Sequence, residues 1–504
     1  MEPSREEIGK LRALPLTIAR ALRVFPTNSS LLFLSVAALV FCSRLPFVGP
    51  GYGSDADAWR IALAGRIMAA RGGYTVSRFP GYPVPEISSA LLWRWGPPAL
   101  NGATALLSAL AAGLFALSLR ALRCKDTWAA ASALAFTPVV FVNSTNSMDY
   151  VWALAFILAA LHLSILDYPL SAGLCLGLAI GCRMTSALML LPLALSLGAS
   201  RPGRGAFAAA ALPGIRRLSL AAFLSGAAAY LPAFLEYGWR FLRFSEGSRP
   251  AVVQVLGRAT TGVWGQLGAA ALLAGTSSLL FGPLRRAGSS SIPQRPEGHQ
   301  LIAWSLAVCF YLAAFLLLPL DPGYLIPIVP FVILLLARLL DRRVFLGFCL
   351  AATASSIIAL CRGGVCGGPI FYEQAARRAG MRQSAEILSR ARSMHEKSLI
   401  VVGPRGLPPI KAGLPLESID SAGSRAPATN ECPAFQGPVK FVAYLDARQL
   451  RQEREEGRQI YYLDSVREWN LSRTGLDLLD SGARPLSLHS SGSFPSRNPA
   501  SLFG

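Results

Sequence analysis

The sequence predicts an α-helical polytopic membrane protein with about eleven transmembrane helices, an amphipathic first outer loop and a small C-terminal α/β domain. Of its 504 residues, 53% are hydrophobic and only 15% are charged, well below the roughly 25% charged of an average soluble domain. Mean hydropathy is +0.43. Apolar runs of about 17–25 residues recur, and this is the length that a helix needs to cross a bilayer.

The basic charge of the chain fits this class. The formal net charge is +20, from 48 Lys and Arg against 28 Asp and Glu. Basic loops on the cytoplasmic side of a membrane set the topology and contact anionic lipid. The charge therefore needs no nucleic-acid partner, and we expect none.

The chain divides into segments by composition. We expect a cytoplasmic N-terminus, a transmembrane domain that contains one long outer loop, an extracytoplasmic α/β domain and a disordered Ser/Pro-rich tail: 1–28, 29–361, 49–98 (the loop), 362–484 and 485–504. The candidate spans are 29–47, 99–119, 127–143, 150–166, 170–182, 185–199, 218–235, 266–283, 300–320, 324–340 and 344–361. With the N-terminus inside, every short inside loop except the turn at Asp167 is basic, as the positive-inside rule requires. Residues 362 onward then lie outside.

The fifth and sixth spans are short, and Arg183 separates them. Half-length helices are tolerated in a membrane only where neighbouring helices cover the break. Arg183 either extends its side chain to the surface or binds a lipid phosphate with its two-pronged guanidinium.

The segment after the last span changes character. Residues 398–403, 439–446 and 460–464 are rich in β-branched and aromatic residues and predict strands, while residues 375–395 and 447–458 predict helices. Three cysteines would lie in an oxidising compartment, so one disulfide and unpaired roles are both open: Cys361, Cys366 and Cys432.

The loop after the first span is the most unusual part of the chain. Residues 54–86 read SDADAWRIALAGRIMAARGGYTVSRFPGYPVPE. Their arginines lie outside, against the positive-inside trend, so they do not serve to set topology. Residues 57–71 predict an amphipathic helix in the interface plane, because four apolar side chains share one face: Ile61, Ala64, Ile67 and Met68.

Asp55 and Asp57 stand at the start of this helix, where backbone N–H groups favour negative charge. Three interpretations are open for them. They cap the helix, one of them acts as a general base beside an acceptor hydroxyl, or both hold a divalent cation through oxygen ligands.

The end of the loop, SRFPGYP, contains turn-forming residues that forbid a regular helix. It is either a re-entry turn into the next span or a rigid segment that presents Arg78 and Tyr82 to a phosphate or a sugar.

Other polar residues fall on the same outer side. Ions at a membrane are costly and usually functional, and a cavity with both charge signs suits an anionic, lipid-attached substrate. The outer polar set is Asp55, Asp57, Arg60, Arg66, Arg78, Glu86, Asp149, Arg183, Glu236, Arg240, Arg243 and Asp321. The candidate substrate-binding residues are Tyr82, Glu86, Asp149 and Asp321.

Four motifs within residues 29–340 carry a likeness to known proteins: DADAWR…GR.M…GGY…SR.PGYP..E, SMDYVWAL, LSAGLCLGLAIGCRMTSALMLLP and DPGYLIPIVPFVILL. Together they resemble the GT-C glycosyltransferase superfamily, and within it the bacterial relatives of protein O-mannosyltransferases and the lipid A aminoarabinose transferase.

The resemblance implies an inverting transferase that moves a sugar from a polyprenyl-phosphate donor to an acceptor hydroxyl at the outer face. The family's first-loop acid aligns with Asp57, with Asp55 as the close competitor. The family often has an Asp-Glu pair there, whereas this chain has Asp57 followed by Ala58, so Asp55, Glu86 or Asp149 could supply the second acid.

Arg78 and Arg183 would stabilise the leaving phosphate. Relatives that use monophosphate donors generally need no metal, so we expect no cofactor, with a divalent ion at Asp55 and Asp57 as the alternative. The acceptor is open between protein, lipid and glycan. The resemblance and the Arg-rich composition favour a bacterial plasma (inner) membrane.

Two other classes of function are open. A polytopic transporter or lipid flippase would show internal repeats with matching interrupted helices, and the chain shows one interrupted pair. A non-catalytic anchor for the C-terminal domain would not need acids and arginines gathered on one side.

Overall fold

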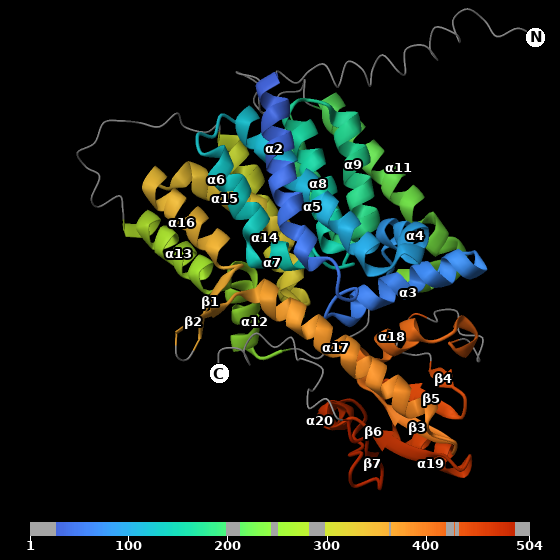
Figure 1. The fold of residues 1–504 in the computed structure, drawn as a ribbon. Helices are drawn as coiled ribbons and strands as arrows, with labels where there is room; N and C mark the ends of the chain where they lie inside the picture. The colour runs from blue at the N-terminus through green and yellow to red at the C-terminus, as the bar shows by residue number, and fades with distance from the viewer. Residues whose placement is uncertain are drawn as a thin grey trace, which may run out of the picture.

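The computed structural model describes residues 27–197, 212–242, 250–281, 298–361, 364–419, 428 and 433–488. The molecule consists of a bundle of roughly aligned helices and a smaller α/β unit. The α/β unit lies at one end of the bundle (Figure 1). Most of the N-terminus expected to be cytoplasmic, residues 1–26, lies outside the described residues.

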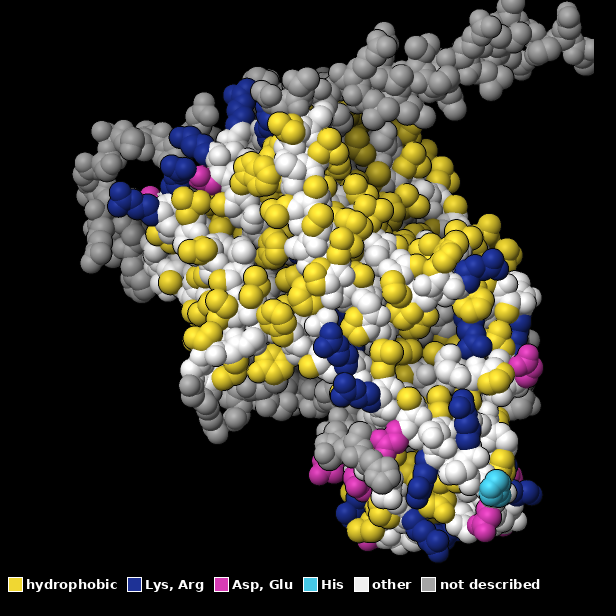
Figure 2. Space-filling model, viewed as in Figure 1, with side chains coloured by type: hydrophobic (Ala, Val, Ile, Leu, Met, Phe, Trp, Pro, Cys, Tyr) yellow, Lys and Arg dark blue, Asp and Glu magenta, His cyan; other side chains and the backbone are white. Residues whose placement is uncertain are grey.

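The bundle is built from apolar helices. Its members are α2 (Thr27–Arg44), α5 (Gly96–Ala121), α6 (Thr127–Phe136), α7 (Pro138–Asn143), α8 (Tyr150–Ile165), α9 (Pro169–Cys182), α10 (Leu190–Leu195), α11 (Leu212–Tyr237), α13 (Thr261–Phe281), α14 (Gly298–Leu317), α15 (Val329–Leu339) and α16 (Arg342–Ala354). Large apolar side chains cover its outer surface (Figure 2), including Phe223 at 70% exposure and Leu317 at 83%. An unpartnered apolar surface of this extent is the surface that lipid covers, so the chain is an integral membrane protein.

Five helical stretches in the described residues are long and apolar enough to cross a membrane: Ser29–Phe47, Pro83–Ala121, Leu212–Leu242, Gly298–Leu317 and Pro322–Leu339. Four shorter apolar helices accompany them: Thr127–Phe136, Tyr150–Ile165, Pro169–Cys182 and Met184–Leu195. The total of about eleven spans stays a prediction.

The last expected span, 344–361, is wrong in its second half. Helix α16 ends at Ala354, and Ile358–Cys361 forms strand β1, which pairs antiparallel with β2 (Gly364–Gly367). Ser355 and Ser356 hold the turn between them, because Ser355 Oγ accepts from Gly268 N and Ser356 Oγ donates to Phe136 O. The domain boundary expected at 361 therefore falls inside a hairpin, which the Cys361–Cys366 disulfide closes.

Helix α3 (Ala56–Arg71) lies across the end of the bundle that faces the α/β unit (Figure 1). Its expected apolar face is confirmed, since Ile61, Ala64, Ile67 and Met68 are all buried. A glycine-rich turn leads to α4 (Pro83–Leu92), and the short helix η2 (Trp93–Trp95) joins α4 to α5.

The polar face of α3 contacts the α/β unit through its arginines. Arg60 donates to Pro404 O (3.4 Å), Arg66 to the carbonyls of Ala412 and Leu414 (2.9 Å each) and Arg71 to Leu416 O (2.9 Å). These acceptors lie in and just after α18 (Gly403–Gly413). The two parts of the molecule therefore meet along this helix.

The α/β unit begins with the long helix α17 (Pro369–Arg392) and contains a five-stranded sheet in the order β4-β5-β3-β6-β7. Strand β3 (Ser398–Val401) pairs in parallel with β5 (Val439–Val442) and β6 (Gln459–Tyr462), with Ser398 opposite Val439 and Gln459. β4 (Ala434–Gln436) is antiparallel and β7 (Arg484–Pro485) parallel. Helices α19 (Ala447–Glu455) and α20 (Arg467–Thr474) complete the unit.

The three strand segments expected from the sequence thus overlap β3, β5 and β6, although each strand ends two to four residues before the expected segment does. The expected boundary at 484 falls inside β7, and Leu486 beyond it is buried. The rest of the tail expected to be disordered, residues 489–504, lies outside the described residues, as does Cys432.

Helices α9 and α11 pack closely because small residues recur where they meet. A Cβ added at Gly177 would lie 1.7 Å from Ser225 Oγ and 2.8 Å from Gly226 N, and one at Gly173 would lie 2.3 Å from Leu218 O. Small residues allow this approach of two backbones in a membrane.

We predict that Gly177→Ala destabilises the protein by about 1–3 kcal/mol, because the added methyl group must push α11 away from α9. Gly102→Ala in α5 is the matched control, since no atom lies within 4 Å of its added Cβ. Thermal unfolding in detergent should show a lower Tm for the first variant only, and equal Tm values would contradict the close packing.

Candidate active site

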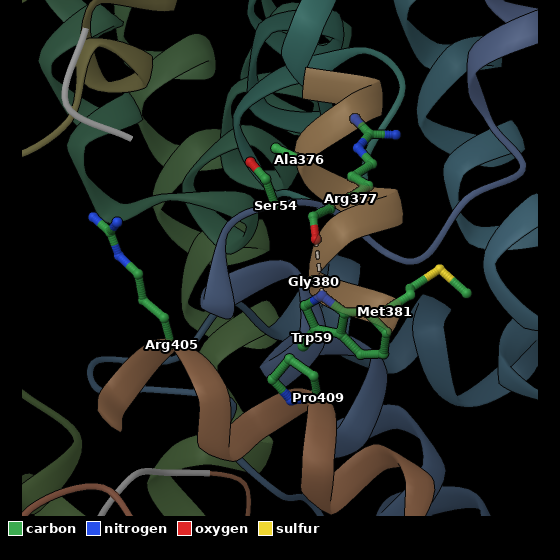
Figure 3. A pocket seen from close by; sticks show the side chains of 9 residues that line it. Ser54, Trp59, Ala376, Arg377, Gly380, Met381, Arg405 and Pro409 are labelled. Atoms are coloured by element: carbon green, nitrogen blue, oxygen red, sulfur yellow. Dashed lines mark hydrogen bonds between the residues drawn. The ribbon is translucent and has the colours of Figure 1, made fainter. Parts of the chain in front are cut away.

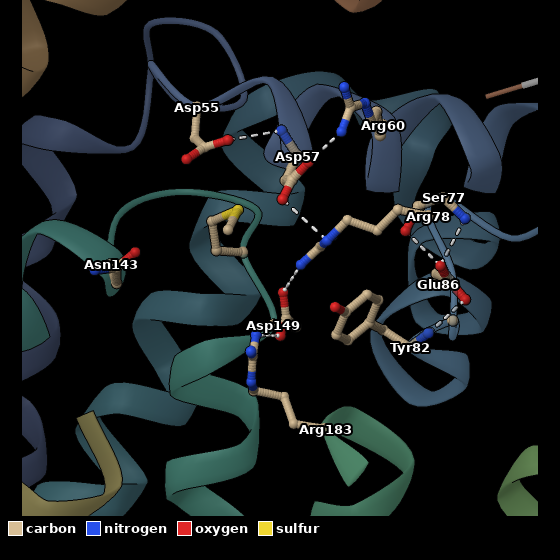
Figure 4. Close-up of polar contacts among 12 residues, drawn as sticks. Asp55, Asp57, Arg60, Ser77, Arg78, Tyr82, Glu86, Asn143, Asp149 and Arg183 are labelled. Carbon is tan, nitrogen blue, oxygen red and sulfur yellow. Dashed lines mark hydrogen bonds and ion pairs between the residues drawn. The ribbon is translucent and has the colours of Figure 1, made fainter. Parts of the chain in front are cut away.

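Five of the charged residues that the sequence places on the outer side meet where the bundle ends: Asp57, Arg60, Arg78, Asp149 and Arg183. Arg243, which belongs to the same expected set, lies outside the described residues. Four segments deliver them: the start of α3, the turn before α4, the loop before α8 and the break after α9 (Figure 4). At their meeting point lie Asp57, Arg78, Tyr82, Asp149 and Arg183.

Helix α3 positions Asp57 through its own N-terminus. Asp55 is the N-cap in an extended conformation, and its carboxylate accepts from Asp57 N at 2.9 Å. Asp57 therefore sits in the first turn, where the helix dipole favours its charge. Of the two acids left open by the sequence, Asp55 caps the helix and Asp57 faces the arginines.

The charged side chains form a continuous chain of ion pairs. Asp57 contacts Arg60 Nη1 at 2.6 Å and Arg78 Nε at 2.9 Å. Arg78 Nη2 reaches Asp149 Oδ1 at 2.7 Å, and Arg183 Nη1 reaches Asp149 Oδ2 at 2.5 Å. Three guanidiniums against two carboxylates give this group, which we call the Asp–Arg cluster, a formal charge of 3 − 2 = +1.

Burial differs sharply within the cluster. The Asp149 side chain is 0% exposed, whereas that of Asp57 is 24% exposed. Burial alone would raise the pKa of Asp149, but Arg183 and Arg78 outweigh it and lower the pKa below its usual 3.8. Asp149 is thus a fixed anion at neutral pH, and Asp57 is the more accessible of the two carboxylates.

Aromatic rings line the arginines. The Arg78 guanidinium lies 3.9 Å from the Tyr82 ring centre, and that of Arg183 lies 4.4 Å from Tyr150 and 4.9 Å from Tyr324. Such cation–π contacts hold a guanidinium without neutralising it. Sequence reasoning missed Tyr150 and Tyr324, although Tyr150 follows Asp149 directly and Tyr324 lies in the DPGYLIP motif.

The break between α9 and the 3-10 helix η3 (Met184–Met189) aims Arg183 at the cluster. Its backbone is extended, with φ −156° and ψ 121°, so the chain leaves the helical path for one residue. The interruption expected from the sequence is therefore present.

Glu86, expected at the substrate, instead holds the turn that carries Arg78. It is fully buried, and its carboxylate accepts from Ser77 N (2.7 Å), Tyr82 N (3.0 Å) and the hydroxyls of Ser77 and Tyr74. Gly81 completes the turn with φ +94°, and a Cβ there would lie 2.9 Å from the Tyr74 hydroxyl. Glu86 thereby fixes the position of Arg78 and Tyr82.

Asp321, the other expected substrate contact, caps the 3-10 helix η7 (Pro322–Ile328) by accepting from Gly323 N at 2.6 Å. This turn places Tyr324 under Arg183. Asp321 therefore acts on the cluster indirectly, because it caps the helix that carries Tyr324.

In the described ranges, no three His, Cys, Asp or Glu side chains gather as a metal site would require. Both oxygens of Asp57 face arginines, an arrangement that competes with a cation. The metal-free mechanism stays a prediction.

A pocket lies beside the cluster, between the first loop, α17 and α18 (Figure 3). Its lining residues are Gly53, Ser54, Trp59, Ala376, Arg377, Gly380, Met381, Arg405 and Pro409. Two of these lining residues are hydrogen-bonded to each other: Trp59 Nε1 donates to Gly53 O at 2.8 Å. None of the five residues at the meeting point lines this pocket, so the two features are distinct.

Comparison with known proteins gives a limited likeness. No family model and no curated protein matches the chain. Two crystal structures of ArnT from Cupriavidus metallidurans are similar to it, each 16% identical over 77% of this chain and 85% of that chain. The TM-score is 0.43 for the structure bound to undecaprenyl phosphate and 0.32 for the apo state. At this level the likeness assigns neither a function nor any residue's role to this chain.

We predict that Asp149→Asn destabilises the protein by about 3–5 kcal/mol, because Arg183 loses its buried carboxylate partner and Arg78 loses one of its two carboxylate partners. Asp126→Asn is the control, since Asp126 pairs with Arg342, whose side chain is 70% exposed; a much smaller change is expected there. Because the folded pKa of Asp149 is lowered, its contribution persists above about pH 4 and is lost as the pH falls through the folded pKa. Tm measured against pH should show this acid loss in the parent protein and not in Asp149→Asn.

Proposed function

We propose that this protein is an inverting membrane glycosyltransferase, which moves a sugar from a polyprenyl-phosphate donor to an acceptor hydroxyl. The observation that carries the proposal is the Asp–Arg cluster, in which a partly exposed carboxylate and two fixed guanidiniums converge at the end of an apolar bundle. The sequence motifs that resemble GT-C enzymes contain these residues, which is the second support.

The reaction is a single displacement. The acceptor oxygen attacks the anomeric carbon and forms the new glycosidic bond as the bond to the phosphate oxygen breaks. Asp57 takes the hydroxyl proton, and the lipid phosphate leaves with the bonding electron pair. Configuration at the anomeric carbon inverts, and the products are the glycosylated acceptor and the polyprenyl phosphate.

Arg78 and Arg183 suit the leaving phosphate. Asp149 holds both in place, yet the cluster keeps a net positive charge. Within the described part of the chain, Arg78 Nη1 is buried and has no hydrogen-bond partner, so it retains donors for a phosphate oxygen. Donors fixed in advance where charge develops lower the barrier most effectively.

The surroundings support a lipid-linked donor. The cluster lies where apolar helices end, so a polyprenyl chain can pack against the bundle while its phosphate reaches the arginines. We propose that the reaction takes place at the outer face of a bacterial inner membrane. We further propose that it needs no metal ion and that the acceptor is a protein, a lipid or a glycan.

The substrates can be found by incubating the purified protein with a panel of radiolabelled polyprenyl-phosphate sugars and membrane fractions. Label should pass to a protein, lipid or glycan fraction, and the labelled fraction defines the acceptor class. If no donor on the panel loses sugar to any fraction, the proposal is overturned.

We predict that Asp57→Asn lowers transfer by about 10²–10⁴-fold, because the amide cannot accept the hydroxyl proton. Binding of polyprenyl phosphate should remain, since the arginines keep Asp149. Asp55→Asn discriminates the two acids: asparagine is an equally good helix cap, so transfer should persist. The opposite pattern, loss at residue 55 and activity at residue 57, would make Asp55 the base.

We also predict that residues from Gly364 onward lie outside the cytoplasm. A reporter enzyme that is active only in the oxidising exterior, fused after residue 488, should be active, and a cytoplasm-only reporter at the same place should be silent. The reverse result would place the cluster on the cytoplasmic side and contradict an outer-face transferase.

A further inference from the structure

Helix α17 carries a buried ion pair whose purpose the reaction above does not explain. Glu373 and Arg377 lie one turn apart, with Arg377 Nε 2.9 Å from Glu373 Oε1. Their side chains are only 6% and 1% exposed. Buried charges are costly unless their remaining hydrogen-bonding groups are satisfied, so their other partners show what the pair does.

Glu373 binds the first loop at the entrance to α3. Its Oε1 accepts from Ser54 N at 3.0 Å, and its Oε2 accepts from Ser54 Oγ at 2.6 Å. Ser54 immediately precedes the N-cap, Asp55, and lies three residues before Asp57. The carboxylate therefore fixes where the helix that carries Asp57 begins.

Arg377 binds the loop that carries Asp149. Its Nη1 donates to Thr145 O at 2.6 Å and to Phe47 O at 3.1 Å, and its Nη2 donates to Thr145 Oγ1 at 3.0 Å. Thr145 lies four residues before Asp149 on the short loop between α7 and α8. One ion pair on α17 thus holds both loops, each close to its acidic residue.

The first loop and the loop between α7 and α8 are in close contact, so neither can shift far relative to the other. Ser147 N donates to Tyr52 O at 2.8 Å, and a Cβ added at Gly53 would lie 2.9 Å from Ala58 Cβ and 3.3 Å from Asn146 Cβ. On the far side of these loops, Arg78 must reach Asp57 and Asp149 at once, at 2.9 and 2.7 Å. The distance between the carboxylates of Asp57 and Asp149 is therefore fixed by α17 on one side of the loops and by Arg78 on the other.

We infer that Glu373 and Arg377 are positioning residues, which hold Asp57 at a fixed distance from the Asp149-bound arginines. This inference rests on the proposed transferase function. Ser54 and Arg377 both lie in the wall of the neighbouring pocket (Figure 3). Helix α17 leads directly into the five-stranded sheet. Through this ion pair, the position of the proposed general base, Asp57, therefore depends on the α/β unit.

The test compares Glu373→Gln and Arg377→Gln with Arg378→Gln, an exposed neighbour on the same helix. The assay uses whichever radiolabelled polyprenyl-phosphate sugar the parent protein accepts. A misplacement of about 1 Å costs on the order of 10²-fold in rate. We therefore expect kcat to fall at least about tenfold in the first two variants, with KM for the donor nearly unchanged because the phosphate site is intact. Arg378→Gln should match the parent, and Arg377→Lys should recover part of the lost kcat.

Two further measurements separate positioning from a general loss of folding. Ser54→Ala is a milder change, and the double variant Ser54→Ala/Glu373→Gln should be no slower than Glu373→Gln alone, because both break the same link. Amide hydrogen exchange should rise in residues 48–57 for Glu373→Gln and in residues 143–149 for Arg377→Gln, and in neither segment for Arg378→Gln.

The possible failures are distinguishable. If the parent protein transfers no sugar, the proposed function fails and this inference fails with it. If the parent is active and Asp57→Asn is not, but kcat is unchanged in Glu373→Gln and Arg377→Gln, only the positioning role is overturned. Independent, additive losses for Ser54→Ala and Glu373→Gln would also overturn it.

Discussion

The buried carboxylate of Asp149 is the interaction on which the rest of the site depends. It is fully enclosed, with Arg78 on one oxygen and Arg183 on the other. A buried charge that loses its partners costs several kcal/mol, so the native bundle requires all three residues together. The irregular segments nearby follow from this requirement. The extended break after α9 delivers Arg183, the turn held by Glu86 delivers Arg78, and the loop before α8 delivers Asp149.

This arrangement divides the cluster into a fixed inner part and an accessible outer part. Asp149 is inaccessible and neutralises part of the charge of its two arginines, while Tyr82, Tyr150 and Tyr324 hold the guanidiniums by their faces. Asp57 stands at the accessible end, at the start of a helix whose dipole stabilises its anion.

The sequence predicts much of this because charge in an apolar context is conspicuous. Arg183 separates two short apolar spans and Asp149 lies between two others, where charge is costly, while Asp57 and Arg78 belong to a loop whose charge runs against the positive-inside trend. The topology alone puts all four on one side, where the structure joins them. Glu86 shows the limit of that reasoning, since a carboxylate that holds its own turn has the same sequence signal as one that faces a substrate. The bonds of Arg377 to Phe47 O and Thr145 O leave no sequence signal either, because any residue offers a carbonyl. The sequence does not show that α16 ends at Ala354, because β-branched residues in an apolar run suit a strand as well as a span.

The outward arginines of the first loop have an explanation that the sequence could not supply. They were expected to lie at a membrane interface, yet Arg60, Arg66 and Arg71 donate to backbone carbonyls in and just after α18. The apolar face of α3 packs on the bundle while its basic face binds α18 and the segment after it, with Arg66 at the helix C-terminal end, where unpaired carbonyls carry partial negative charge. Helix α3 is therefore held between the two units, and Asp57 at its first turn is placed by both. A protein cut between them would lose the carbonyl acceptors of these arginines together with Glu373 and Arg377, so the C-terminal unit is part of what builds the site.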